Sequence, residues 1–313
     1  MAKVALVQRA PVVLNKSKSI EKVVQIINEL VEQSVELAVF PETYLPGYPA
    51  WIWRLRPGGD WGTSEQVHAR LLKNSIDLST NELDPILSAA AKNNMTIVLG
   101  LNERASEGSK STIYNSAILI SNNGKLINVH RKLMPTNPER MVWGNGDASG
   151  LNVVDTPVGK VGSLICWENF MPLSRYALYA QGVEVYIAPT YDSGDGSIGT
   201  MQHIAREGRC WVLCCGVALE RHDLPDDFPS KDELYSAEED WINPGDSVVV
   251  APGGEIVAGP LNKEKGYLIC DIDSDKATYA RRALDVAGHY ARPDIFNLTI
   301  NKAKQTHINV SFD

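Results

Sequence analysis

The sequence has fewer basic than acidic residues, and no stretch in which lysines and arginines gather. Among its 313 residues, 30 are lysine or arginine and 38 are aspartate or glutamate, which gives a formal charge of −8 at pH 7. Binding to the phosphates of a nucleic acid requires a basic surface. The charge balance therefore excludes nucleic acid as an expected partner.

Long apolar runs and leader-like segments are also missing. No apolar run approaches the roughly 20 residues that cross a membrane, so we expect no membrane association. The N-terminus lacks the longer apolar core and small-residue cleavage site of a secretory signal, since it begins MAKVALV. Only five cysteines occur, an odd number that suits a reducing compartment better than a disulfide framework. These features predict a cytoplasmic protein.

The cysteines lack the spacing of a metal site. Cys210, Cys214 and Cys215 lie in the apolar run RCWVLCCG without a CxxC pair or an accompanying histidine. Adjacent residues of a strand point to opposite faces, so Cys214 and Cys215 are not expected to converge on one ion. We interpret these thiols as core residues and expect neither a metal ion nor an organic cofactor.

What the sequence does contain is an alternation of strand-like and helical patterns, which predicts an α/β fold. The first three segments form a βαβ unit: a strand over residues 3–8, a helix over 17–33 and a strand over 36–40. Two long polar stretches, 54–66 and 221–245, are predicted to be surface loops. The remaining predicted segments of this region are a helix at 83–93, a strand at 95–101 and a hairpin at 113–131 that turns at Asn122-Asn123-Gly124.

A repeat within the chain predicts two related halves. The segment QSVELAVFP at residues 33–41 has the pattern of QGVEVYIAP at 181–189, and KVALV near the N-terminus has that of KVGSL at 160–164. Both pairs occur in the same order and at similar separation. We therefore predict two pseudo-symmetric βαβ halves that face each other in one domain over residues 1–301, followed by a short polar tail at 302–313.

Three reactive side chains stand where predicted strands end. Cys166 closes the run VGSLI, Glu42 follows LAVFP, and Lys132 follows LINVHR. Ligands bind at strand ends in open α/β sheets, where loops gather. A thiol of pKa about 8.5 needs a base and a nearby cation to act as a nucleophile, and a glutamate and a lysine supply both. Taken singly, each residue also suits an ordinary role: a buried thiol, a helix cap and a solvated cation.

The segments around these residues are more specific than the residues alone. Glu42 lies in FPETYLPGYP, Lys132 in HRKLMPTNPERMVWGNGD and Cys166 in LICWENFMPLSRYAL. With these segments, the chain resembles the nitrilase branch of the carbon-nitrogen hydrolase superfamily from about residue 2 to residue 300. The resemblance implies Glu42 as general base, Lys132 as the cation that stabilises the intermediates, and Cys166 as nucleophile. It also implies Glu139 as a second carboxylate that helps to order them.

The resemblance further implies a fold and an activity. The fold is an αββα sandwich that pairs into a four-layer dimer. The activity is hydrolysis of an organic nitrile to its carboxylic acid and ammonia, through a covalent thioimidate and then a thioester on the cysteine. Alternatives within the superfamily are an amidase, a carbamoylase or a cyanide-degrading hydrolase, and a further alternative is a scaffold without activity. Trp167, directly after Cys166, resembles the nitrilase form of the motif.

Aromatic residues are candidates for the substrate pocket. A cluster of four, Tyr44, Tyr48, Trp51 and Trp53, follows Glu42 and either lines a pocket or packs beneath a loop. Tyr191, just after the repeated segment at 181–189, precedes a glycine-rich loop. The substrate-binding residues that we predict are Tyr48, Trp51, Trp167 and Tyr191.

That glycine-rich loop also suggests a rival function. Residues 194–199 spell GDGSIG, which matches the GxGxxG fingerprint of dinucleotide-binding folds. In those folds the glycines form a tight turn between strand and helix, whereas Gly194 lies several residues after the predicted strand. We expect the loop to rim the pocket instead.

The resemblance implies a small-molecule nitrile and further copies of the same chain as partners, in a homodimer or a higher homo-oligomer. Our candidate for the contact surface is the helix after Cys166, with Leu173, Tyr176, Ala177 and Tyr179. Packing of this helix within the monomer explains the same apolar residues.

Overall fold

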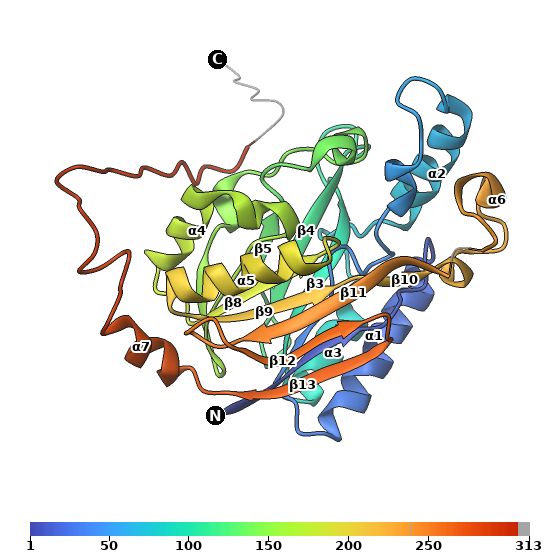
Figure 1. Ribbon diagram of the computed structural model, residues 1–313. Helices are drawn as coiled ribbons and strands as arrows, with labels where there is room; N and C mark the ends of the chain where they lie inside the picture. The colour runs from blue at the N-terminus through green and yellow to red at the C-terminus, as the bar shows by residue number, and fades with distance from the viewer. Residues whose placement is uncertain (239, 306–313) are drawn as a thin grey trace, which may run out of the picture.

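Two mixed β-sheets face each other between two layers of helices (Figure 1). The computed structural model describes residues 1–238 and 240–305. The layers follow the order α-β-β-α, which confirms the predicted sandwich. One chain supplies all four layers, and the pairing of two chains stays a prediction. The last eight residues of the predicted tail, 306–313, lie outside the described residues.

The first sheet contains six strands in the order β13-β1-β2-β3-β4-β5. Helices α1 (Lys16–Val31) and α3 (Asp84–Lys92) cover its outer face, and α2 (Trp61–Asn74) lies towards one end (Figure 1). The hairpin predicted at 113–131 is confirmed as β4 and β5. The strands are β1 (Ala2–Gln8), β2 (Leu37–Val39), β3 (Thr96–Arg104), β4 (Ile113–Ile120), β5 (Leu126–Arg131) and β13 (Gly266–Ile272).

The second sheet contains seven strands, six in the order β10-β11-β9-β8-β7-β6, with β12 paired to β11. Its outer face is covered by α4 (Pro172–Tyr179) and α5 (Asp195–Gly208), while two short helices, α6 (Lys231–Leu234) and α7 (Asp275–Arg281), lie at the periphery (Figure 1). The strands are β6 (Val153–Thr156), β7 (Gly159–Ser163), β8 (Val185–Thr190), β9 (Trp211–Gly216), β10 (Ala218–Glu220), β11 (Trp241–Val250) and β12 (Ile256–Asn262).

The pairing pattern is the same in both sheets. In the first sheet, β1, β2 and β3 are parallel, with antiparallel β13 and β4 on either side. In the second, β7, β8 and β9 are parallel, with antiparallel β6 and β11 on either side. Helices connect the parallel strands in both cases. The two pseudo-symmetric βαβ halves predicted from the repeated segments are therefore confirmed.

Strand alternation divides the core into layers. Val4 and Leu6 of β1 belong to the cluster between the sheets, whereas Ala5 and Val7 belong to the cluster beneath α1 and α3. The same alternation separates Cys214, which packs towards the helices of the second sheet, from Cys215, which lies between the sheets. These thiols are core residues on opposite faces, as predicted.

Three local expectations need correction. The stretch 54–66 is not wholly a loop, because α2 begins within it at Trp61, and the stretch 221–245 contains α6 and the start of β11 at Trp241. Helix α2 buries only Val67 and Leu71 fully, so its apolar pattern is too sparse to recognise. The strand before Cys166 also ends earlier than expected, at Ser163, and a short 3-10 helix begins at the cysteine itself.

In the described part of the chain, no helix combines the length and the apolar character needed to cross a bilayer.

Gly100 lets the loop after β2 lie against β3. A Cβ at this position would clash with the carbonyl oxygen of Pro41 and the backbone nitrogen of Thr43, the two neighbours of Glu42. We predict that Gly100→Ala lowers the free energy of unfolding by about 1–3 kcal/mol, the usual cost of overpacking. Urea denaturation followed by circular dichroism measures this change.

The matched control is Gly199→Ala, an exposed position in α5 where a Cβ has no neighbour within 4 Å. Alanine there should stabilise the helix by up to about 1 kcal/mol, because it favours helical backbone over glycine. Equal stability of Gly100→Ala and the unsubstituted protein would contradict the prediction.

Candidate active site

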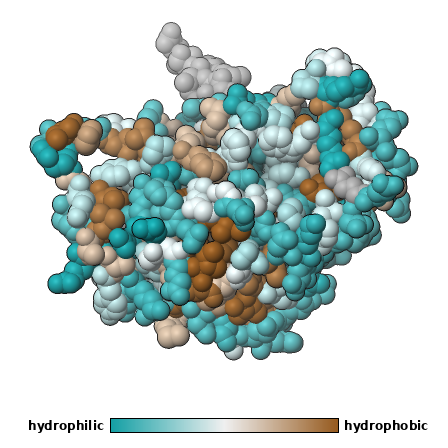
Figure 2. Space-filling model, in the orientation of Figure 1, coloured by the Kyte–Doolittle hydropathy of each residue, from teal (hydrophilic) through white to brown (hydrophobic). Residues whose placement is uncertain are grey.

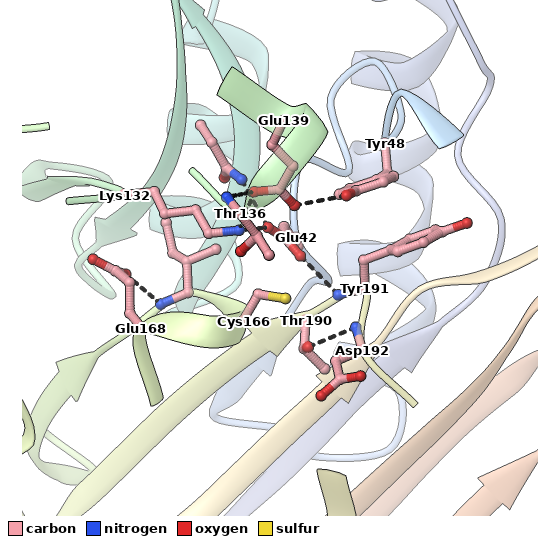
Figure 3. Close-up of polar contacts among 12 residues, drawn as sticks. Glu42, Tyr48, Lys132, Thr136, Glu139, Cys166, Glu168, Thr190, Tyr191 and Asp192 are labelled. Atoms are coloured by element: carbon pink, nitrogen blue, oxygen red, sulfur yellow. Dashed lines mark hydrogen bonds and ion pairs between the residues drawn. The ribbon is translucent and has the colours of Figure 1, made fainter. Parts of the chain in front are cut away.

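Glu42 lies in the loop after β2, and its buried carboxylate accepts hydrogen bonds from three protein groups. Its Oε1 accepts hydrogen bonds from Asn115 Nδ2 at 2.7 Å and from Lys132 Nζ at 2.8 Å. Its Oε2 accepts the backbone N–H of Tyr191, which follows β8 in the other sheet, at 2.7 Å. The carboxylate is buried and joins both halves of the sandwich (Figure 3).

Lys132 follows the last residue of β5 and lies between two carboxylates. Its Nζ is 2.8 Å from Glu42 Oε1 and 2.7 Å from Glu139 Oε2, and all three side chains are buried. Glu139 belongs to η2 (Asn137–Met141), where its carboxylate also accepts the backbone N–H of Thr136 at 2.6 Å. Tyr48 donates its hydroxyl to Glu139 Oε1 at 2.6 Å. The structure thus brings Glu42, Lys132 and Glu139 into one connected network.

Cys166 begins η4 (Cys166–Phe170) with a backbone φ of 53°. This left-handed conformation is uncommon for a residue with a side chain and marks a tight, well-supported turn. The buried thiol lines the same cavity as Tyr48 and Glu139, and Figure 3 shows its sulfur pointing towards Tyr191 and Thr190. All four residues implied as catalytic therefore meet at one site.

Burial sets the ionisation of these groups. It raises the pKa of the Cys166 thiol to about 12; Glu42 adds to the rise and Lys132 opposes it. Burial also raises the pKa of Glu42, against the lowering effect of Lys132. For Lys132, burial lowers the pKa, but Glu42, Cys166 and Glu139 outweigh it and the net pKa is raised. The lysine is therefore a permanent cation, and the resting thiol keeps its proton.

A second buried pair connects the cysteine to the lysine segment. His130 Nε2 lies 2.9 Å from Glu168 Oε2. Glu168 also accepts the backbone N–H of Leu133 at 2.7 Å and that of Ile165 at 2.6 Å. The carboxylate thus links the residue after Lys132 to the residue before Cys166. Burial raises the pKa of Glu168, but His130 and these N–H groups outweigh it and lower the net value.

Sequence reasoning did not assign a role to His130 or Glu168. Both lie inside the quoted segments, two residues from Lys132 and from Cys166 respectively. A histidine two positions before the lysine, and a glutamate two positions after the cysteine, are polar residues next to buried strands. A polar side chain next to a buried strand indicates that it has a buried hydrogen-bond partner, but the sequence does not show which residue that partner is.

The thiol opens into a cavity of about 360 Å³. Of the four predicted substrate-binding residues, Tyr48, Trp167 and Tyr191 line it. Trp51 does not: its ring packs 5.5 Å from that of Phe228, and it faces a separate cavity beside α2. The position is taken by Trp53, whose indole N–H donates to the Tyr48 hydroxyl at 3.0 Å. The 3-10 helix η1 (Ala50–Trp53) turns the two indoles in different directions.

The glycine-rich segment does not have the geometry of a dinucleotide-binding turn. Strand β8 ends at Thr190 and α5 begins at Asp195, so no tight strand-to-helix turn forms. A Cβ at Gly194, Gly196 or Gly199 would have no neighbour within 4 Å, so no close packing demands these glycines. The residues that line the cavity here are Asp192 and Ser193, which precede Gly194, whereas residues 195–199 form the start of α5 and do not line it. The expectation that the glycine-rich segment itself rims the pocket is therefore wrong.

Among the described residues, one cluster has the spacing of metal ligands: Glu220, His222 and Asp223. Lys265 pairs with both of its carboxylates, with its Nζ 2.5 Å from Glu220 and 2.7 Å from Asp223. The cluster is thus explained as an ion-pair network.

Comparison with known proteins identifies the family. A family model described as carbon-nitrogen hydrolase matches residues 3–282. The chain belongs to the carbon-nitrogen hydrolase family. Among its relatives, an aliphatic nitrilase of Sinorhizobium fredii is 37% identical over 305 residues, covering 97% of each chain. Nitrilase 3 of Arabidopsis thaliana is 36% identical over 311 residues, covering 96% of this chain and 87% of the plant protein. These relatives place the chain in the nitrilase branch of the family, and the resemblance is confirmed.

Solved structures of the family have the same fold. A carbon-nitrogen hydrolase from Helicobacter pylori superposes with a TM-score of 0.69 at 19% identity, covering 94% of this chain and 96% of that one. At this level of identity the likeness concerns the fold, and it supports the αββα sandwich.

The raised pKa of Cys166 leads to a measurable pH dependence. Only the thiolate attacks an alkylating agent, and with a pKa of about 12 its fraction grows throughout the range below that value. We predict that alkylation of Cys166 by iodoacetamide accelerates about tenfold per pH unit from pH 7 to pH 9.5, whereas a free thiol of pKa about 8.5 levels off within this range. Mass spectrometry of the peptide that contains Cys166 gives the rate, and a plateau below pH 9.5 would contradict the prediction.

Proposed function

We propose that this protein is a cofactor-independent nitrilase, which converts an organic nitrile and two waters into a carboxylic acid and ammonia. The observation that carries the proposal is the buried network of Glu42, Lys132 and Glu139 beside the Cys166 thiol in one cavity. The names of near full-length relatives support the same reaction.

In the first step, Glu42 acts as general base and Cys166 as nucleophile. Because burial raises the pKa of Glu42, its carboxylate accepts the thiol proton more readily than a solvated glutamate does. The sulfur attacks the nitrile carbon, and the C≡N bond becomes C=N as the nitrogen takes up a proton. The product is a thioimidate, and Lys132 stabilises the charge that develops on nitrogen.

The second stage consumes both waters. Glu42 activates a water that adds to the thioimidate carbon, and ammonia leaves the tetrahedral adduct, which forms a thioester. A second water, activated in the same way, attacks the thioester, and the acid leaves as the Cys166 thiol regains its proton. Glu139 orders Lys132 through its 2.7 Å contact and so acts as a positioning residue.

The decisive test is a panel of nitriles and the matching amides, with ammonia, acid and amide quantified. We predict acid and ammonia from nitriles. We also predict that Cys166→Ala lowers turnover by about 10³-fold or more, because the covalent intermediate can no longer form. Cys270→Ala, a half-buried thiol far along the chain on β13, is the matched control and should keep its activity. Turnover of amides alone, or an active Cys166→Ala variant, would overturn the proposal.

We further infer that the chain acts as a homo-oligomer in a reducing compartment. All five cysteines are free thiols. Helix α4 does not present the whole predicted surface, because Ala177 and Tyr179 pack inward and the Tyr179 hydroxyl donates to Glu207. Leu173, however, is 65% exposed.

The C-terminal segment adds exposed apolar surface on the same side of the molecule. It extends from α7 away from the body of the protein (Figure 1), and Figure 2 shows apolar surface along it. Its large apolar side chains include Phe296, which is 75% exposed, together with Tyr290 and Ile295. Exposed aromatic side chains of this kind suit burial against a second copy.

Light scattering after size-exclusion chromatography tests the assembly. We predict a dimer or larger species at a protein concentration of about 10 μM, which is above the dissociation constant of a complex of micromolar affinity or better. Leu173→Glu places a charge in the contact and should shift the measured mass towards that of a monomer. Leu126→Glu, at an exposed position on β5, is the control and should leave the mass unchanged. A monomeric unsubstituted protein would contradict the inference.

A further inference from the structure

Asp192 is a carboxylate in the cavity wall without a cationic partner among the described residues. It follows β8 and lines the cavity together with the Cys166 thiol. Burial raises the pKa of Asp192, and the groups that oppose this rise are the neutral donors Ser193, Trp167 and Ser197. A half-buried carboxylate that has only neutral donors gains from a cation and resists a second anion.

The other charged groups at the site lie in one ion-pair network, which holds two carboxylates and one ammonium. The Lys132 ammonium lies between Glu42 and Glu139, with contacts of 2.8 and 2.7 Å. None of the described residues that line the cavity is a lysine, an arginine or a histidine. A ligand in this cavity therefore meets a net negative wall, and Asp192 is the carboxylate in that wall which the protein leaves without a countercharge.

Four aromatic side chains also line the cavity, Tyr48, Trp53, Trp167 and Tyr191. The rings of Tyr48 and Tyr191 stack with centroids 3.8 Å apart, which gives a flat surface beside the nucleophile. Trp53 and Trp167 also line the cavity, and their side chains are 44% and 46% exposed. A ring bound in this cavity would bury apolar surface, and aromatic faces attract cations as well as other rings.

We propose that the site selects nitriles that carry an aromatic group and no negative charge, with Asp192 as the residue that excludes anionic nitriles. The inference rests on the proposed function and adds the substrate class to it. Neutral and cationic aromatic nitriles enter because the rings bind them and the carboxylate does not oppose them. An anionic nitrile of the same shape brings two like charges into one poorly solvated cavity, which costs binding.

The test compares three para-substituted phenylacetonitriles of similar size that carry a methyl, an aminomethyl or a carboxylate group. We expect kcat/KM for the carboxylate to be roughly tenfold or more below that of the methyl compound, from like-charge repulsion in a cavity of intermediate dielectric. The aminomethyl compound should equal or exceed the methyl compound. An aliphatic nitrile of equal carbon number should be turned over less efficiently than the methyl compound.

Asp192→Asn removes the charge and keeps a hydrogen-bond acceptor for Ser193 and Trp167. We expect it to raise the ratio of kcat/KM for the carboxylate to that for the methyl compound by roughly tenfold. Asp195→Asn is the matched control: it makes the same change in net charge three residues along the chain, at an exposed position outside the cavity wall. Its ratio should stay at the unsubstituted value.

The outcomes separate the two proposals. If no nitrile is hydrolysed, the proposed function fails. If nitriles are hydrolysed but the carboxylate compound matches the methyl compound, or Asp192→Asn leaves their ratio unchanged, the function stands and the inference about substrate charge is overturned. A preference for aliphatic over aromatic nitriles would overturn the part that concerns the rings.

Discussion

The structure depends on one buried cation, the ammonium of Lys132. Its desolvation is unfavourable unless anions surround it, and Glu42 and Glu139 each lie within 2.8 Å of it. Removing Lys132 would leave two buried carboxylates without a countercharge, and loss of one partner of a buried ion pair costs about 3–5 kcal/mol in other proteins. The three side chains come from three different segments. Their pairing therefore fixes the loop after β2, the end of β5 and η2 relative to one another.

The two-half architecture explains why these segments meet. Glu42 follows β2, Cys166 follows β7 and Tyr191 follows β8, so parallel strands from both halves deliver their carboxyl ends to one place. The backbone N–H of Tyr191 donates to Glu42 across the sandwich, and Glu168 links the lysine segment to the cysteine segment. The site thus lies where the two halves of the fold meet, and hydrogen bonds from backbone N–H groups fix its geometry.

Burial at the site bears on both the proposed reaction and the proposed selectivity. It raises the pKa of the Cys166 thiol and that of Glu42, and in the proposed mechanism the carboxylate takes the thiol proton. The same poor solvation strengthens the field of Asp192 in the cavity wall. The proposed reactivity and the proposed charge selectivity thus depend on one property of the cavity, poor solvation, through different carboxylates.

The sequence by itself determined the α/β pattern, the two related halves and the hairpin at β4 and β5, because local periodicity and repeated segments lie along the chain. Family motifs, which are also read along the chain, identified Glu42, Lys132, Glu139 and Cys166 as the candidate site residues. It did not determine that α2 begins within a polar stretch, since that helix buries few side chains. Only the tertiary structure decided that Trp53 lines the cavity and Trp51 does not, and that His130 reaches Glu168. The direction of a side chain in a 3-10 helix, and the partner of a buried polar group, depend on packing between segments that lie far apart in sequence.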